Sequence, residues 1–370
     1  MPSVFLPVKA MGCENIPSRN ELPSMTPTFT KFRKIIVGLF IFLIAAIALG
    51  FFYHPWRAGD AQVLRSQMLN LLPADSSAVI FVDLDQFRAT PFLAQLLQWA
   101  PQRPPEEEYK QFVQDSGFDY ERDLHRIAVS VSKKSGGDSI FGIADGRFDR
   151  NKMEAYAMKN GRQVGSSSNR VFAISLNNSS RTLFFTFLND NRIAWTDDSA
   201  AESSPAPRTR RDAEWQEHFS RLAGTPLFAL FKQDSGGIAG LTQQAPGGFR
   251  SPQLAELLAQ LRWISLGGKP EGDILRVVVE GESPSDATAR QLNDFLGGIL
   301  LLSQAGLNSA KNNKQLDPAL RDAYLELLRS TEVKKIDRGE VKSVRLVFEV
   351  TPKLLQAAEI PKTAGASTSK

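Results

Sequence analysis

Two aspartates at the end of an apolar run are the residues in this sequence best placed for chemistry. The run from Ala78 to Leu84, AVIFVDL, predicts a buried strand, and Asp83 and Asp85 form an Asp-x-Asp pair at its end. Carboxylates at a strand end project into a cleft, where their oxygens suit Mg²⁺. Asp83 and Asp85 are therefore the candidate metal ligands of a metal-dependent hydrolase. The simpler interpretation is structural: Asp83 ends a strand, and Asp85 precedes a helix that starts at Thr90.

The sequence around this pair resembles two enzyme motifs. VIFVDLDQF, from Val79 to Phe87, is similar to the first motif of the haloacid-dehalogenase phosphatases, which implies a nucleophilic role for Asp83. It is also similar to the first metal motif of the translesion polymerases. Phe87 and Arg88 replace the small glycine-threonine turn of the phosphatases, and the second acidic motif of the polymerases is missing. Short motifs match by chance often, so the structural interpretation is favoured.

Other chemistry-bearing residues are few. Glu214 and His218 are one turn apart on a predicted helix, which is half of a metal site, but a solvated salt-bridge face explains them more simply. The chain has one cysteine, Cys13, so a disulfide framework and multi-cysteine metal sites are excluded. No G-x-S-x-G, H-E-x-x-H or P-loop pattern occurs. We expect no cofactor and no catalytic activity. The charged run from Asp119 to Arg126 is expected to be a solvated turn.

The elements that carry these residues predict an α+β fold. The expected strands are 78–84, 125–132, 139–148, 171–176, 182–188, 192–196, 226–232, 262–267, 274–280, 333–336 and 341–350. The expected helices are 59–72, 91–100, 106–115, 149–160, 212–222, 251–260, 284–304 and 318–328. A polar, serine- and proline-rich stretch at 197–211 is the best internal boundary.

Both halves have the same order of elements, β-α-β-β-α-β with additions. That order is typical of ferredoxin-like, antiparallel-sheet domains with helices on one face. One short match, Gly137–Gly146 with Gly272–Gly281, supports an internal repeat. Two unrelated α+β domains remain the alternative. We therefore expect two tandem α+β domains, at 74–200 and 212–356, joined by a linker at 201–211 and followed by a disordered tail at 357–370.

A hydrophobic segment precedes these domains. Residues 35–53 read IIVGLFIFLIAAIALGFFY and carry no charge. A helix of this length spans roughly 28 Å, which is about one hydrocarbon core. The segment predicts a single transmembrane helix in the lipid bilayer, with a cytoplasmic segment at 1–34 before it and a juxtamembrane helix within 54–73 after it.

The charges beside this helix predict its orientation. Lys31, Arg33 and Lys34 come directly before it, so the N-terminus is expected in the cytoplasm and the domains outside. Cleavage as a signal peptide after the small-x-small pattern at Ala46–Ala48 is the alternative, and Met25 is an alternative start. The net charge of +4 comes largely from residues 1–53, so the exported part is nearly neutral and nucleic acid is not an expected partner.

The opening of the exported part carries a second resemblance. Leu71–Asp75, LLPAD, followed by Val79–Asp83, VIFVD, is similar to the opening of a loose group of uncharacterised bacterial membrane-anchored envelope proteins. Phe118–Leu124 is similar to another element of that group. The resemblance implies an anchored bacterial envelope protein of unknown function. We therefore expect an inner-membrane protein with its domains in the periplasm, where it binds or scaffolds, with an envelope protein as an expected partner. The sequence does not define the ligand or the oligomeric state. A ligand held between the sheet and the helix at 284–304 is a third hypothesis.

Overall fold

The computed structural model describes residues 58–99, 107–134, 137–165, 170–175, 181–198, 213–233, 252–309 and 317–358. These residues belong to one compact unit, Ile44–Lys370. The predicted segments 1–34, 35–53 and 201–211 lie outside them, as do residues 359–370 of the predicted tail. None of the helices in the described ranges has the length and apolar character that a membrane crossing needs.

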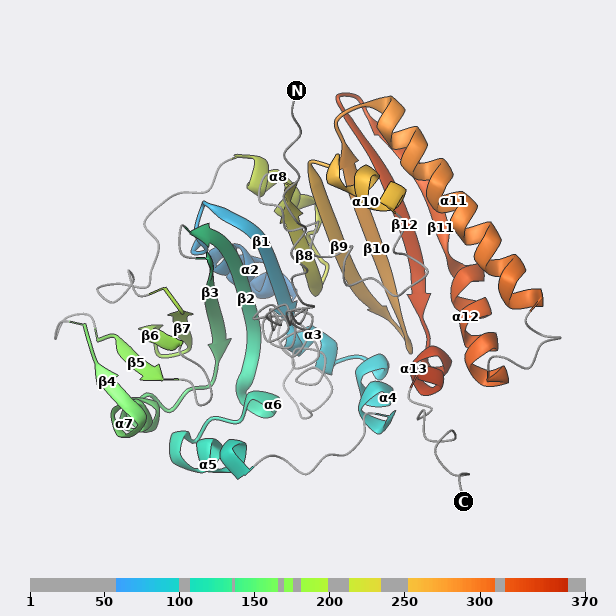
Figure 1. Ribbon diagram of the computed structural model, residues 1–370. Helices are drawn as coiled ribbons and strands as arrows, with labels where there is room; N and C mark the ends of the chain where they lie inside the picture. The colour runs from blue at the N-terminus through green and yellow to red at the C-terminus, as the bar shows by residue number, and fades with distance from the viewer. Residues whose placement is uncertain are drawn as a thin grey trace, which may run out of the picture. The chain divides into compact units, whose positions relative to one another are not determined.

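The described residues build one antiparallel sheet of 12 strands, in the order β11-β12-β10-β9-β8-β1-β2-β3-β7-β6-β5-β4 (Figure 1). The strands are β1 (Ser76–Asp83), β2 (Leu124–Lys134), β3 (Gly137–Gly146), β4 (Gly161–Gln163), β5 (Phe172–Ser175), β6 (Thr182–Asn189), β7 (Arg192–Thr196), β8 (Leu227–Lys232), β9 (Trp263–Glu271), β10 (Ile274–Ser283), β11 (Glu332–Arg338) and β12 (Val341–Val350). All the expected strands are present, and the three-residue β4 is the one that the sequence pattern missed.

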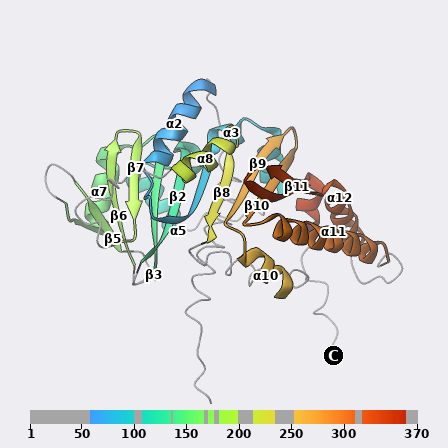
Figure 2. The ribbon, with the colours of Figure 1, turned by 90° about the horizontal axis from the view of Figure 1, so that it is seen from above.

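The helices are α2 (Ala58–Asn70), α3 (Leu84–Arg88), α4 (Pro91–Trp99), α5 (Glu107–Ser116), α6 (Tyr120–Asp123), α7 (Arg150–Asn160), α8 (Ala213–Arg221), α10 (Pro252–Ala259), α11 (Asp286–Ser309), α12 (Pro318–Ser330) and α13 (Pro352–Ala358). Both faces of the sheet carry helices: α2 and α8 lie on one face, and α10 and α11 lie on the other (Figure 2). The expectation of helices on one face is therefore wrong, because the central strands carry apolar residues on both faces of the sheet.

The α+β class and the large antiparallel sheet are confirmed, but two details of the expected architecture are wrong. The two halves do not have separate sheets, because β1 of the first half pairs directly with β8 of the second. Both strands are apolar, so their pairing hides two aggregation-prone edges. A ferredoxin-like sheet is also excluded, because it places another strand between the two that flank the first helix. Here β1 and β2 are direct neighbours.

Each half builds its part of the sheet in the same order, outward from the β1–β8 seam. In the first half the order is β1-β2-β3-β7-β6, and in the second it is β8-β9-β10-β12-β11. In both halves the last strand along the chain returns to lie beside the third from the seam. The hairpin of β4 and β5 extends the first half alone.

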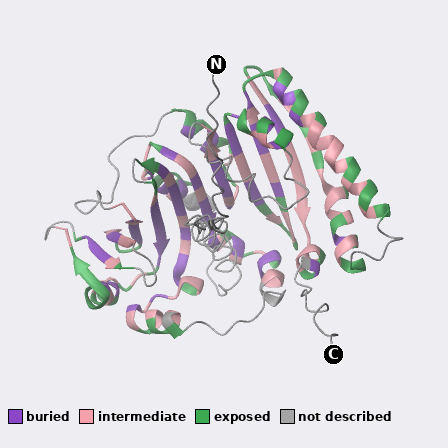
Figure 3. Cartoon of the chain, in the orientation of Figure 1, coloured by how far each residue is buried: buried purple, intermediate pink, exposed green. Residues whose placement is uncertain are grey.

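The main core lies over this seam. Phe81 of β1 stacks on Phe228 of β8, with ring centroids 5.3 Å apart, and Trp215 of α8 packs edge-on against Trp263 of β9. The Arg65 guanidinium of α2 lies 4.8 Å from the centre of the Phe228 ring. Figure 3 shows the buried residues concentrated on the central strands. The seam is therefore an interior layer rather than a contact between two finished domains.

A second core lies beneath the N-terminal part of α11. Ala289 and Leu292 of α11 pack with Ile264 of β9 and Val344 of β12, together with Leu257 of α10. Side chains fill the space between the sheet and this part of α11. The hypothesis of an apolar ligand between the sheet and the helix at 284–304 is therefore not supported there.

Candidate functional site

Asp83, the first candidate metal ligand, is 1% exposed, and its two carboxylate oxygens are occupied. It ends β1 and caps α3: the Gln86 backbone N–H donates to Oδ1 at 3.1 Å, and the Gln86 side chain donates to Oδ2 at 2.9 Å. Arg126 Nε also donates to Oδ2, at 3.0 Å. The carboxylate therefore starts a helix and neutralises a buried arginine, as the structural interpretation predicts.

Asp85, the second candidate ligand, meets cationic groups as well. Its Oδ1 accepts from Arg88 Nη1 at 3.2 Å and lies 2.9 Å from His125 Nδ1. Arg126 Nη2 is 3.9 Å from the other oxygen. The structure thus brings Asp83 and Asp85 to one arginine, Arg126. Among the described residues no group of three or more metal-ligating side chains occurs.

Asp83 belongs to a buried row of alternating charges that the sequence pattern did not reveal. The direct cross-strand neighbours on β1, β2, β3 and β7 are Asp83, Arg126, Asp145 and Arg192. All four are less than 9% exposed, and Arg192 forks onto Asp145 with contacts of 2.5 and 2.9 Å. Opposite charges placed directly across a sheet stabilise its register. The signal in the sequence was a charged residue at one end of each of four apolar runs.

The run from Asp119 to Arg126 is more buried than the expected solvated turn. Asp123 is 5% exposed and meets Arg122 at 2.7 Å and Arg147 at 3.1 Å. Asp119 caps α6. Burial, helped by the nearby Asp119 charge, raises the pKa of Glu121 to about 7. The run is a packed connection before β2, and its expectation as a solvated turn is wrong.

The Glu214 and His218 pair does not converge on a metal site. Glu214 accepts from Trp263 Nε1 at 2.6 Å and pairs with Lys232 at 3.0 Å. His218 is 5% exposed and stacks on Trp263, and burial lowers its pKa to about 4. The expected solvated face is correct for Glu214 but wrong for His218, because α8 lies flat on the sheet.

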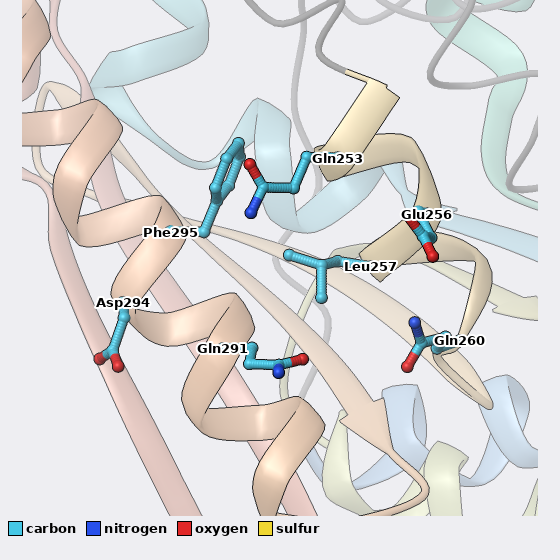
Figure 4. Close-up of a pocket in the computed structure, with 7 residues that line it drawn as sticks. All are labelled: Gln253, Glu256, Leu257, Gln260, Gln291, Asp294 and Phe295. Atoms are coloured by element: carbon cyan, nitrogen blue, oxygen red, sulfur yellow. The ribbon is translucent and has the colours of Figure 1, made fainter.

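A pocket of about 410 Å³ lies between α10 and α11 (Figure 4). Its apolar floor is Leu257 and Phe295, one from each helix, and its five polar lining residues are all exposed. They are Gln253, Glu256, Gln260, Gln291 and Asp294. Water satisfies exposed amides and carboxylates, so this groove has the character of ordinary surface.

A pocket of about 330 Å³ on the opposite face holds the buried charges of the second half. It lies between α8 and the outward-facing residues of β9, β10 and β12. Its 14 lining residues are His218, Arg221, Leu222, Thr225, Ser265, Gly267, Lys269, Glu271, Arg276, Val278, Glu280, Glu282, Arg338 and Arg345. We take this as the candidate functional site and name it the β10 pocket.

Glu280 is the most strongly bound charge in the β10 pocket. Arg345 Nη2 donates to its Oε2 at 2.8 Å, Ser343 Oγ donates to Oε1 at 2.8 Å, and Arg338 contacts both oxygens. Burial by itself would raise the pKa of Glu280, but these hydrogen bonds outweigh it and lower the pKa to about 2. Glu280 is therefore ionised throughout the physiological range.

Glu282, two residues further along the same face, has the opposite tendency. Arg221 contacts its Oε1, and His218 Nδ1 lies 3.6 Å from the same oxygen. Burial, with the neighbouring Glu280 charge, nevertheless raises the pKa of Glu282 above its ordinary value. The sequence pattern missed the whole pocket, because its residues come from five separate elements.

Comparison with known proteins adds little to this geometry. The sequence matches no family model, and no curated protein matches it. Two solved structures of TP0453 are similar in overall arrangement. Its crystal form I matches with a TM-score of 0.41 and 8% identity, over 79% of this chain and 96% of that chain. Its crystal form IV matches with a TM-score of 0.40 and 8% identity, over 79% of this chain and 95% of that chain.

Proposed function

We propose that this protein is a membrane-anchored binding or scaffolding protein of the bacterial envelope, without catalytic activity. The uncharged segment at 35–53 anchors it in the inner membrane, and residues 74–356 lie in the periplasm. The observation that carries the binding role is the β10 pocket, a cavity of about 330 Å³ in which the buried Glu280 and the half-buried Glu282 and Arg345 lie among exposed charged side chains. Ligand pockets are concave and hold a few convergent polar groups of this kind.

We further propose that the two halves are copies of one ancestral unit. Asp145-Gly146 ends β3, Glu280-Gly281 lies in β10, and these strands hold the same place in their halves. The residue directly across from each acid, on the next strand outward, is an arginine: Arg192 or Arg345. The sequences that follow these arginines, RIAW from Arg192 and RLVF from Arg345, match in character.

The seam supports the same equivalence independently. If Asp145 and Glu280 are equivalent, their cross-strand partners toward the seam are equivalent too. Those partners are Arg126 and Ser265, and then Asp83 and Leu230. Phe81 and Phe228 then occupy one position, two residues earlier in their strands. They are direct cross-strand partners, as residues on a two-fold axis through the seam must be.

The alternative function, a metal-dependent extracytoplasmic hydrolase that uses Asp83 and Asp85, is weakened by the geometry. Arg126, Arg88 and Gln86 hold these carboxylates. A thermal-shift titration of the full chain with Mg²⁺, Mn²⁺ and Ca²⁺ tests it. Stabilisation by one of these metals, lost in Asp83→Asn, would support the hydrolase and count against a pure binding role.

The anchor and topology are tested by cell fractionation. We expect the full chain to stay with membranes after an alkaline carbonate wash. We expect protease to reach residues 74–356 in spheroplasts but not in intact cells. Release by carbonate, or protection in spheroplasts, would contradict the proposed topology.

The binding role is tested by purification of the full chain from membranes in a neutral detergent. Native mass spectrometry then looks for a co-purifying small molecule, and cross-linking before lysis looks for an envelope protein. Recovery of neither, from cells that express the chain at its natural level, would count against a binding or scaffolding role.

A further inference from the structure

The two copies of the acid–arginine pair differ in charge. In the first half the pair is closed: Asp145 and Arg192 match one to one, with side chains 10% and 9% exposed. In the second half Glu280 receives two guanidinium groups, from Arg345 and from Arg338. Two guanidinium charges on one carboxylate leave a net positive charge at the base of the β10 pocket.

The extra arginine comes from the hairpin between β11 and β12. The corresponding hairpin of the first half, between β6 and β7, carries Asp190 and Asn191 at its turn. Arg338 therefore has no basic counterpart in the first half. Its side chain is 32% exposed and that of Arg345 is 37% exposed, although both are bound to a buried carboxylate. Guanidinium N–H groups thus remain available on the pocket side.

A second cationic pair lies in the same pocket. Lys269 of β9 and Arg276 of β10 are direct cross-strand partners, and Glu349 of β12 is directly opposite Arg276 on its other side. The ion pair that the described residues offer Arg276 is with Glu271, at 3.7 Å. Lys269 and Arg276 therefore add two cationic side chains to the lining of the pocket.

The pocket has room for a ligand beside these groups. Its volume is about 330 Å³, and Ser265 and Gly267 of β9 lie in its lining, with Leu222 and Thr225 packed onto Gly267. Five cationic side chains and three carboxylates line it, and His218 is neutral because of its low pKa. The net charge of the lining is therefore +2.

We propose that the β10 pocket binds an anionic group, a carboxylate or a phosphate, of a small molecule, and that Arg338, Arg345, Lys269 and Arg276 bind that group. The proposal rests on the binding function proposed above and names its ligand class. An anion neutralises the excess positive charge of the pocket and offsets the repulsion between Lys269 and Arg276. The equivalent place in the first half is closed by the buried pair of Asp145 and Arg192, so one copy of the repeat is structural and the other binds.

The test uses the full-length chain in a neutral detergent, with ionic strength held constant by NaCl. Inorganic phosphate, glycerol 3-phosphate and citrate are titrated, and tryptophan fluorescence reports binding, because Trp263 contacts His218 in the lining. We expect saturable binding of at least one probe. Preference among the three distinguishes a phosphate from a carboxylate and a free ion from an ester.

Two variants test the residues. Lys269 is exposed, so Lys269→Gln leaves the core intact, and it should weaken binding about fivefold through the loss of one charge-assisted contact. Arg338→Gln should weaken it about tenfold or more, since it removes one of the two guanidinium charges that give the base of the pocket its net positive charge. Lys353→Gln is the matched control: it removes the same charge from α13, where the side chain is 75% exposed, and should leave binding unchanged.

Absence of saturable binding by all three probes would overturn the proposal, and so would equal affinities of Lys269→Gln and Lys353→Gln. These failures are separate from failure of the proposed function. A neutral molecule or a protein that co-purifies with the chain would uphold the binding role and overturn the anionic ligand.

Discussion

The opposite pKa tendencies of Glu280 and Glu282 give a matched test of the β10 pocket. Both carboxylates lie on one face of β10, and both are largely buried, with side chains 11% and 12% exposed. The fold lowers the pKa of Glu280 from 4.5 to about 2 and raises that of Glu282. A group with a depressed folded pKa stabilises the fold when ionised, and a group with a raised pKa does the reverse.

The size of the Glu280 effect follows from its pKa. The difference between 4.5 and about 2 corresponds to about 3 kcal/mol of folding free energy at neutral pH. That contribution is fully present above about pH 4.5 and is lost as the pH falls toward 2. Glu280→Gln should therefore destabilise the chain by about 3 kcal/mol at pH 7, with a smaller deficit at low pH. The variant also leaves Arg338 and Arg345 beside each other without their shared carboxylate.

The assay is urea unfolding of the full chain in a neutral detergent, followed by tryptophan fluorescence. Urea is uncharged, so it does not screen the ion pairs under test. The informative quantity is the difference in unfolding free energy between wild type and variant as a function of pH, because other carboxylates cancel in it. Trp215 and Trp263 lie in the main core and report its unfolding.

Glu282→Gln is the control. Its charge is disfavoured by burial and by Glu280, so its removal should cost less than removal of Glu280, and the difference from wild type should change with pH in the opposite direction. Equal losses in the two variants at pH 7, or a Glu280→Gln deficit that does not shrink below pH 4.5, would refute the assignment of Glu280 as the ionised centre of the pocket.

Four further variants test other parts of the structure by urea unfolding. Asp83→Asn should cost about 3–5 kcal/mol, since it removes the buried carboxylate charge that accepts from the buried Arg126, and a loss below 1 kcal/mol would contradict the buried ion pair. Glu121 keeps its proton in the folded state between about pH 4.5 and 7. The unfolding free energy of wild type should therefore fall by about 1 kcal/mol across that range, whereas that of Glu121→Gln should not. Parallel curves of unfolding free energy against pH for the two proteins would contradict this. Gly142→Ala places a methyl carbon 2.1 Å from the Trp195 ring and should lower the unfolding free energy by about 1–3 kcal/mol. Gly297→Ala adds its methyl group to open space on a helix and should raise the unfolding free energy by about 0.5–1 kcal/mol. Equal effects of the two variants would contradict this packing.

The sequence predicted what is local in this fold. Strand β2 alternates apolar and polar residues from Val129 to Ser132, and β6 is rich in phenylalanine and threonine. Asp317-Pro318 marks the start of α12 by its capping chemistry alone. The β1–β8 seam could not be found in this way, because any two apolar strands satisfy the same pattern. The pairing of β1 with β8 depends on the whole sheet, that is, on contacts between residues far apart in the sequence.

The candidate site could be predicted only in part, because it too depends on strand pairings between distant parts of the sequence. Asp83 stands out in the sequence, but its role follows from Arg126, 43 residues away, which only the β1–β2 register places beside it. The acid-glycine match at Asp145 and Glu280 was visible as a sign of repetition. It could not be identified as a charge centre, because the arginines opposite those acids lie 47 and 65 residues further on.

The two-fold relation between the halves explains how one of them keeps an open, charged pocket. The lining of the β10 pocket carries a net positive charge, which costs stability in the half that contains it. Phe81 and Phe228 stack across the seam, and Arg65 of α2 lies over both rings while it donates to the Phe219 carbonyl of α8. Elements of both halves thus meet in one core, so the strain of the β10 pocket is shared with a first half whose own charges are buried and paired. On the proposed duplication, fusion of the sheets would leave one copy free to change its charges for the proposed binding role while the other continued to hold the fold.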